Sequence, residues 1–210
     1  MRLAIIAATG VLLAVSTALA EPIDGKTARK MLFAPKGFEV EIVPDSGLDE
    51  TQRGYVALLV EDREFKKTAK YYGAMAVSPS FFDRVAAGRA GPGTLALLKF
   101  TDNFNSPAAA AAAALRGCNA GRARGDRPCV LAARILPKRW EPRDLTLSSG
   151  ASQAFKVYRR EGAPKAFAVS DGSPAFSVVA GENAVATALE RCNTLAARAG
   201  GPDCTILIAD

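Results

Sequence analysis

The chain is predicted to be an α+β protein of two similar units, each with the order β-α-β-β-α-β of the ferredoxin-like arrangement. The motif Ala-Leu-x-x-Cys-Asn occurs twice, at 114–119 and 188–193, and each copy closes a predicted helix. A loop, a second cysteine and a strand follow each copy. Ala-Met-Ala-Val-Ser at 74–78 also matches Ala-Phe-Ala-Val-Ser at 166–170. We therefore expect a tandem duplication, with antiparallel sheets, helices on one face of each sheet and one disulfide per unit.

The first twenty residues are predicted to be a secretory signal peptide. Arg2 supplies a basic start, Leu3–Val15 is apolar but too short to span a bilayer, and Ala18-Leu19-Ala20 is a small-residue cleavage signal. The domains expected after it are a first unit at 21–136, a linker around Trp140 at 137–143, and a second unit at 144–210.

Net charge and composition restrict the function classes. The 27 Lys and Arg residues against 21 Asp and Glu give a net charge of +6, or +5 without Arg2, which is too mild to predict a nucleic-acid partner. The chain has no histidine, which excludes Ser-His and Cys-His nucleophile systems and imidazole metal sites. No second long apolar run follows the leader, so no membrane span is expected after cleavage.

The first part of unit one reads as a helix, a strand, a helix and a strand. A helical turn or two is expected after Gly25, and residues 37–43 alternate apolar and acidic side chains as a half-buried strand does. A turn at 44–47 leads into a helix at 49–67, although 55–60 is apolar enough to be a strand instead. The charges of 61–70 indicate a solvated helix end. Residues 71–78 are predicted to be the next strand.

The remainder of unit one contains a loop, a strand, a helix and a strand. The glycines of 81–93 predict a flexible loop, and 94–101 alternates as a strand. Ser106 and Pro107 supply a hydroxyl cap and a proline at the first helical position, so a helix should begin there and end at Cys118. The strand that follows is expected at 129–136.

The second unit is predicted to repeat this order. The expected elements are a short strand at 144–148, a helix at 149–160, strands at 166–170 and 174–180, a helix at 184–192 and a last strand at 204–209.

Four cysteines lie beyond the leader, and export makes two disulfides the expected state. Sequence alone allows three pairings, but each repeat carries its own pair, which favours Cys118–Cys129 and Cys192–Cys204. Each bond would close a loop of roughly a dozen residues and contribute about 3 kcal/mol. A zinc site is the rival interpretation, and the lack of Cys-x-x-Cys and of histidine disfavours it. No metal and no cofactor are expected.

Positive charge concentrates between residues 116 and 139, where seven basic residues accompany one acid, Asp126. A disulfide-closed loop that presents arginines beside an aromatic side chain could hold carboxylates or phosphates. An ordinary solvated loop is the competing interpretation. The candidate anion-binding residues are Arg116, Arg122, Arg124, Arg127, Lys138, Arg139 and Trp140.

Catalytic groups are less evident. A Ser–Lys dyad would need Ser78 or Ser170, which sit at equivalent strand ends where a turn residue is the usual role. Glu39 and Glu41 share one strand face and are better explained as a solvated surface than as paired acids of a glycosidase.

Several of these motifs are similar to a family of exported bacterial domains of unknown function. The shared features are Gly-Ala-Met-Ala-Val-Ser at 73–78, the helix end Ala-Leu-Arg-Gly-Cys at 114–118, and Cys129 before the last strand of the unit. Most of the chain also resembles small exported alphaproteobacterial proteins that often carry the name 5-aminolevulinic acid synthase. The resemblance implies export and cystine pairs, and it transfers no catalytic residue.

The synthase activity itself is not expected. Pyridoxal phosphate chemistry needs a buried Schiff-base lysine and an acidic partner for the pyridine nitrogen. This chain has no histidine to stack on the ring and no recognisable lysine pocket. We expect instead a non-enzymatic module in the bacterial periplasm or secreted from the cell, which contacts anionic envelope polymers or another envelope protein. The alternative is an enzyme with carboxylates or lysines in the groove between the halves.

Overall fold

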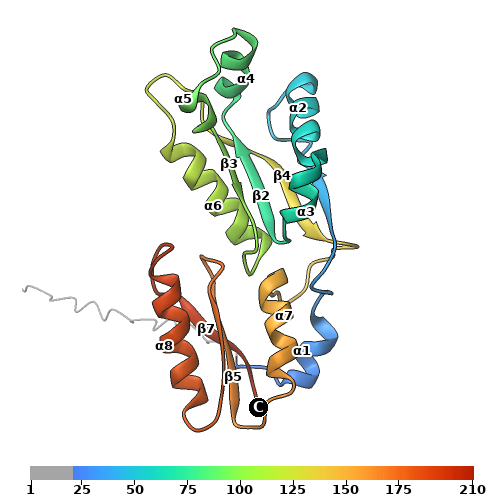
Figure 1. The fold of residues 1–210 in the computed structure, drawn as a ribbon, viewed down its shortest axis with the longest axis vertical. Coiled ribbons are helices and arrows are strands. Elements are labelled where there is room, and N and C mark those ends of the chain that lie inside the picture. Colours follow the sequence, from blue (N-terminus) through green and yellow to red (C-terminus); the bar gives the residue numbers. More distant parts are fainter. Residues whose placement is uncertain (1–20) are drawn as a thin grey trace, which may run out of the picture.

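The computed structural model describes residues 21–210, and the expected signal peptide at 1–20 lies outside the described residues. The chain forms a four-stranded sheet and a three-stranded sheet, both antiparallel, with helices packed against each. Figure 1 shows the two units stacked along the long axis of the molecule. The α+β class with two antiparallel sheets is therefore confirmed.

The first sheet has the strand order β1-β4-β2-β3. Glu41 and Arg134 face each other on its outer pair of strands, with 3.1 Å between Oε1 and Nη1, and such opposite charges add a few tenths of a kcal/mol to an antiparallel pair. The strands are β1 (Phe38–Ile42), β2 (Gly73–Val77), β3 (Leu98–Thr101) and β4 (Val130–Pro137).

The helix expected at 49–67 is present as two consecutive helices, α2 (Glu50–Glu61) and α3 (Arg63–Thr68). Asp62 separates them, because its extended backbone ends α2 while its side chain accepts hydrogen bonds from the first N–H groups of α3. The alternative strand at 55–60 is wrong.

The loop predicted at 81–93 is wrong, since α4 (Pro79–Ala86) and α5 (Pro92–Leu95) occupy most of it. Ser78 and Pro79 start α4 with the same cap and proline that start the next long helix, and this signal outweighs the glycines that follow. Because α5 takes up residues 92–95, strand β3 begins at Leu98 rather than at 94.

Helix α6 (Pro107–Ala120) begins at the predicted cap, where the hydroxyl of Ser106 accepts a hydrogen bond from the N–H of Ala109. Its alanines are small enough for the helix to lie close on the sheet, and Ala110 and Ala114 are fully buried. At its end the approach is so close that a Cβ on Gly121 would lie 2.2 Å from the carbonyl oxygen of Ala96.

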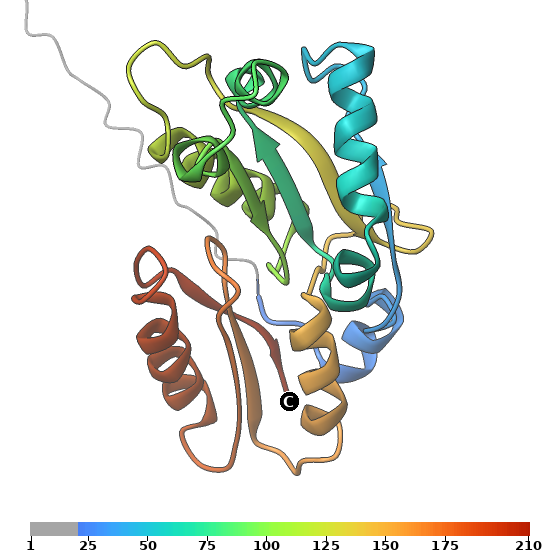
Figure 2. The same cartoon turned by 45° about the horizontal axis from the view of Figure 1, so that its top comes forward.

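Helices cover both faces of the first sheet, which corrects the expectation of helices on one face. Ala74 and Ala76 of β2 pack in one apolar cluster with α6, while Met75 and Val77 pack in another with α2 and α4. Every residue of β2 is buried, as a strand covered on both sides requires. Figure 2 shows α2 in cyan and α6 in yellow-green on opposite sides of the sheet.

The second sheet has the order β6-β5-β7, which corresponds to β3-β2-β4 of the first. Both central strands carry a register shift at the same place in the shared motif, after Met75 in β2 and after Phe167 in β5. The elements are α7 (Ser149–Tyr158), β5 (Lys165–Ser170), β6 (Phe176–Ala180), α8 (Ala184–Ala196) and β7 (Cys204–Ala209).

The strand predicted at 144–148 is wrong, so the second unit lacks the first strand of the β-α-β-β-α-β order. Leu145 and Leu147 instead enter the core beneath the second sheet as irregular backbone. Residues 21–31, which sequence assigns to the first unit, lie at that sheet. Ile23 pairs with Ile208 on the free side of β7, and α1 (Gly25–Met31) packs against α7 through Ala28.

Both predicted disulfides are present, Cys118–Cys129 and Cys192–Cys204, with Cα–Cα distances of 6.1 and 6.0 Å. The asparagine that follows the first cysteine of each disulfide makes the same hydrogen bond in both units. Its side-chain oxygen accepts a hydrogen bond from the N–H of the second cysteine, at 3.1 Å from Asn119 and 2.9 Å from Asn193. Two disulfides indicate folding in an oxidising compartment. Over residues 21–210, no helix combines the length and the apolar character that a membrane crossing requires.

Buried polar contacts join the two units. Asn105, which is 4% exposed, reaches from the start of α6 into the second unit. Its Nδ2 lies 3.0 to 3.3 Å from the carbonyl oxygens of Ser170, Ser173 and Ala175, and its Oδ1 accepts from the N–H of Ser148 at 3.3 Å.

Candidate anion-binding groove

The predicted anion-binding residues do not form one site. Arg122, Arg124 and Arg127 lie in the loop between Cys118 and Cys129, whereas Lys138, Arg139 and Trp140 follow the opposite end of β4. Eight strand residues separate the two groups, a distance of about 25 Å. Arg116 lies on α6, beside the loop at 199–203 of the second unit.

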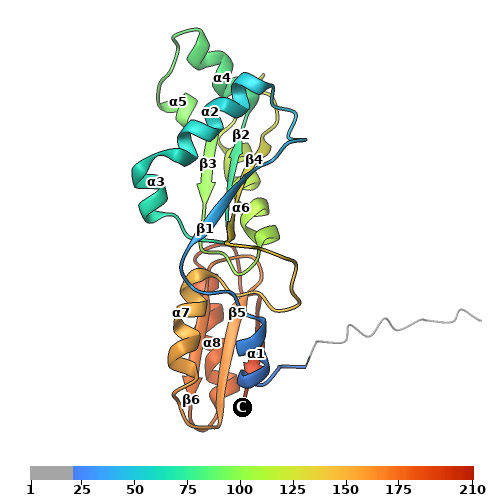
Figure 3. The ribbon, with the colours of Figure 1, turned by 90° about the vertical axis from the view of Figure 1, so that its right-hand side faces the viewer.

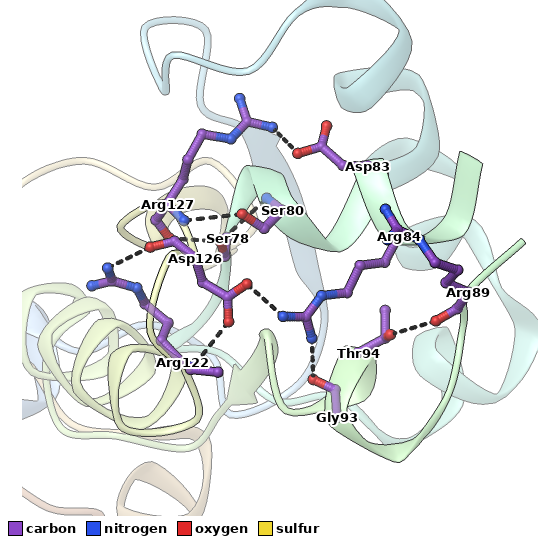
Figure 4. A network of polar contacts seen from close by, with 11 residues as sticks. Ser78, Ser80, Asp83, Arg84, Arg89, Gly93, Thr94, Arg122, Asp126 and Arg127 are labelled. Atoms are coloured by element: carbon purple, nitrogen blue, oxygen red, sulfur yellow. Dashed lines mark hydrogen bonds and ion pairs between the residues drawn. The ribbon is translucent and has the colours of Figure 1, made fainter. Parts of the chain in front are cut away.

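The cysteine loop is held against α4 and α5 by the network in Figure 4. At its centre is the carboxylate of Asp126, whose side chain is 6% exposed. This carboxylate accepts hydrogen bonds from Arg84 Nη2 at 2.5 Å and from the N–H of Ala123 at 2.8 Å. Arg84 also donates to the carbonyl oxygen of Gly93, so one arginine ties the loop to both helices.

Two of the loop arginines are used within the same network. Arg122 donates from Nη2 to the carbonyl oxygen of Asp126 at 2.6 Å and from Nη1 to the side chain of Asn119 at 3.1 Å. Arg127 pairs with Asp83 at 2.6 Å. Arg124 is exposed and has no polar partner among residues 21–210, whereas the Arg127–Asp83 pair is exposed and holds Arg127 only weakly.

Ser78 has a structural role in this network rather than that of a nucleophile. Its hydroxyl donates to the carbonyl oxygen of Arg127 at 2.6 Å and accepts from the N–H of Ser80 at 3.2 Å. Ser170 is likewise fully buried, and its hydroxyl oxygen is contacted by the N–H and the hydroxyl of Ser173. Neither serine has a lysine partner among residues 21–210, so the described part of the chain gives the Ser–Lys dyad no support.

A basic depression lies at the junction of the two units as a groove with a volume of about 600 Å³. Its walls come from α3, from β1 and the residues before it, and from Ser149 at the start of α7. Figure 3 shows α3 and β1 above α1 and α7 on this side of the molecule. Five lysines line the groove, namely Lys36, Lys66, Lys67, Lys70 and Lys138.

Three of these lysines have no ion-pair partner within the part of the chain that the structure describes, namely Lys36, Lys70 and Lys138. The other two are paired on α3, Lys66 with Glu61 and Lys67 with Glu64, the latter at 3.8 Å. Both pairs are exposed, so they hold the lysines weakly. The groove therefore carries positive charge available to a ligand.

Aromatic side chains form the floor behind the lysines. Tyr71 lines the groove, and its hydroxyl donates to Ser152 at 3.2 Å. Behind it, Tyr72 and Trp140 pack with Leu136 and Phe38 in one cluster. Burial raises the pKa of Tyr71 and of Tyr72, so both phenols stay neutral at physiological pH. Trp140 is partly buried and packs against this cluster.

Sequence reasoning found only one of the five groove lysines, Lys138. Lys66, Lys67 and Lys70 fall within the charge-dense stretch 61–70, which reads as a solvated helix end, and Lys36 stands alone. The excess of basic residues at 63–70, four against one acid, is the sequence signal that could have indicated this basic surface.

No protein-family model, no curated protein and no solved structure matches the chain. The candidate site therefore rests on the geometry of this chain alone.

Proposed function

We propose that the protein is an exported, disulfide-stabilised, non-catalytic binding module that holds anionic groups of an envelope polymer in the lysine groove. The observation that carries this proposal is the gathering of Lys36, Lys70 and Lys138 around one open depression, with no ion-pair partner for any of them in the described chain from 21 to 210. The contact surface moves from the cysteine loop to the groove, because three lysines without ion-pair partners among residues 21–210 line the groove, whereas Arg124 alone of the loop arginines lacks a partner there.

The weakness of single contacts favours a polymer over a small anion. A lysine about 4 Å from an anion gains about 1 kcal/mol when both face water. Three such contacts total about 3 kcal/mol, less than the roughly 4 kcal/mol of a millimolar complex. Useful affinity therefore requires a ligand that presents many anionic groups at once.

The groove gives less support to an enzyme. The acids that line it are Glu39 and Glu61, and both are exposed to solvent. Glu61 is paired with Lys66, and Glu39 accepts a hydrogen bond from the N–H of Trp140 at 3.4 Å. General acid–base catalysis at neutral pH usually relies on a buried group, and both of these acids face solvent.

The test is binding of the purified protein to an anionic polysaccharide, measured by calorimetry over a range of salt concentrations. Wild-type binding should weaken as salt rises, since exposed charges are screened. The triple variant Lys36→Ala, Lys70→Ala, Lys138→Ala should lose most of this affinity.

A matched control removes three positive charges elsewhere, through Arg124→Ala, Arg191→Ala and Arg198→Ala. These residues are exposed and lie outside the groove. The control should keep wild-type affinity. Equal losses in the two triple variants, or binding that ignores salt, would overturn the assignment to the groove.

A further inference from the structure

A second basic depression lies at the far end of the second unit, with a volume of about 280 Å³. It is lined by Lys26 and Arg29 of α1, by Arg159 and Lys165, and by Asp210. We call it the distal hollow.

The one acid of the distal hollow is already engaged. The Asp210 carboxylate accepts from the N–H of Gly25 at 2.9 Å and from the hydroxyl of Tyr158 at 3.0 Å, and it lies 3.6 Å from Lys165. The exposed side chains of Lys26, Arg29 and Arg159 have no acidic partner within residues 21–210. Like the groove, the distal hollow offers three uncompensated positive charges.

Helices α1 and α7 connect the two depressions. Ser149, the first residue of α7, lines the groove, and Arg159, which follows its last residue, lines the distal hollow. Ten helical residues place them about 15 Å apart. Helix α1 runs in the opposite direction, since its start lies beside Tyr158 while Pro35 accepts a hydrogen bond from the Ser149 hydroxyl at 2.6 Å.

Basic side chains continue along α1 between the two depressions. Lys30 is exposed and lies one turn after Lys26, on the same face of the helix and on the groove side of it. Lys36 follows at the edge of the groove. Positive charge thus extends from one depression to the other.

We propose that the groove and the distal hollow are two ends of one track that binds a linear anionic glycan across both units. This inference rests on the proposed function and adds the class and the minimum length of the ligand. A chain that reaches both depressions must span about 15 Å, so binding at the second depression becomes intramolecular and affinity rises steeply with ligand length.

The chemistry of the lining favours a glycan over a nucleic acid. In the groove every cation is a lysine, a point charge that accepts anions at variable spacing, whereas the distal hollow adds the guanidinium forks of Arg29 and Arg159, which suit carboxylates and phosphates alike. Proteins that bind single-stranded nucleic acids also offer exposed aromatic rings for base stacking. Of the two aromatic residues in the groove, Tyr71 is 1% exposed and Phe38 belongs to the aromatic cluster behind the groove.

The test compares digalacturonate with decagalacturonate, which carry the same carboxylates at different lengths. We expect the long oligomer to bind wild type about a hundredfold more tightly. The triple variant Lys26→Ala, Arg29→Ala, Arg159→Ala should reduce affinity for decagalacturonate about tenfold or more and leave the affinity of the groove for digalacturonate unchanged. Polyphosphate of similar length tests phosphate against carboxylate, and tighter binding of polyphosphate than of decagalacturonate would overturn the assignment to a glycan.

The outcomes separate the two proposals. If both oligomers bind equally and the distal variant has no effect, the track is wrong while the groove remains. If no polyanion binds in a way that depends on the groove lysines, the proposed function fails. If an oligodeoxythymidylate of equal charge binds more tightly than decagalacturonate, the assignment to a glycan is overturned.

Discussion

Replacing Asn105 should separate the two units more effectively than any other single side-chain change at their junction. The Asn105 amide can donate two hydrogen bonds to the three carbonyl oxygens that face it and accepts one from Ser148. At about 1 kcal/mol each, the loss of three hydrogen bonds in Asn105→Ala should lower the free energy of unfolding by about 3 kcal/mol. The groups left unpaired are buried, so about 3 kcal/mol is a lower bound on the loss of stability.

The measurement is urea and thermal unfolding followed by far-UV circular dichroism and by the fluorescence of Trp140, the only tryptophan. A loss of about 3 kcal/mol corresponds to a Tm lower by about 6–12 °C in a protein of this size. Trp140 lies in the aromatic cluster beside the junction, so its emission should report loosening there.

Asn105→Asp provides the internal comparison. Aspartate keeps the oxygen that accepts from Ser148 but turns a second oxygen toward three carbonyl groups and buries a charge. At neutral pH it should destabilise at least as much as alanine does. A loss below about 1 kcal/mol for Asn105→Ala, or an aspartate variant milder than alanine, would refute the argument that this amide joins the units.

Three further predictions concern stability. Replacing Cys118 and Cys129 together by alanine should lower the free energy of unfolding in urea by about 3 kcal/mol, and a reducing agent should then add only the loss due to the other disulfide. Gly121→Ala should lower the free energy of unfolding by about 2 kcal/mol or more in thermal unfolding, because the added Cβ would meet backbone atoms. Gly117→Ala should be neutral or stabilising, because its Cβ would meet only a flexible lysine side chain. Equal effects of the two substitutions would contradict this reasoning. Burial raises the pKa of Tyr72 in the folded protein above its value in the unfolded chain. The stability that Tyr72 contributes should therefore be constant below about pH 10, and the free energy of unfolding should fall at higher pH, where the phenol ionises in the unfolded chain first. A free energy of unfolding that does not change above about pH 10 would contradict this prediction.

Local signals in the sequence predicted most elements and both disulfides. The Cys-Asn pair that ends each copy of the repeated motif has a physical meaning, since the asparagine side chain binds the N–H of the partner cysteine. Because this hydrogen bond joins residues of one unit, the repeated motif indicates that each cysteine pairs within its own unit rather than with a cysteine of the other unit. The duplication itself stays a prediction, although the two units share strand order and register shift.

Errors arose where contacts between distant residues decide the structure. Residues 144–148 have the length and pattern of a strand, but the free side of β7 is taken by Ile23, more than a hundred residues earlier. The expectation of helices on one face failed because both faces of β2 are apolar, so α6 packs on Ala74 and Ala76 while α2 and α4 pack on Met75 and Val77.

In the candidate site, too, local sequence shows the charge, while contacts between distant residues decide which charges remain available. The density of arginines at 116–139 is visible in the sequence, but their partners Asp83 and Asn119 are recognisable only once α4 and α6 are in place. The groove is assembled from residues 36, 66–70 and 138, which nothing in the sequence brings together. A charge run indicates where basic residues are abundant, and only the fold shows which of them remain available.

The most direct test of the account is amide hydrogen exchange with and without a saturating anionic polysaccharide. Binding in the groove predicts slower exchange at 35–40, at 66–71 and around Lys138, while the loop at 119–128 exchanges as in the free protein. Protection confined to 119–128, with 35–40 and 66–71 unchanged, would contradict it.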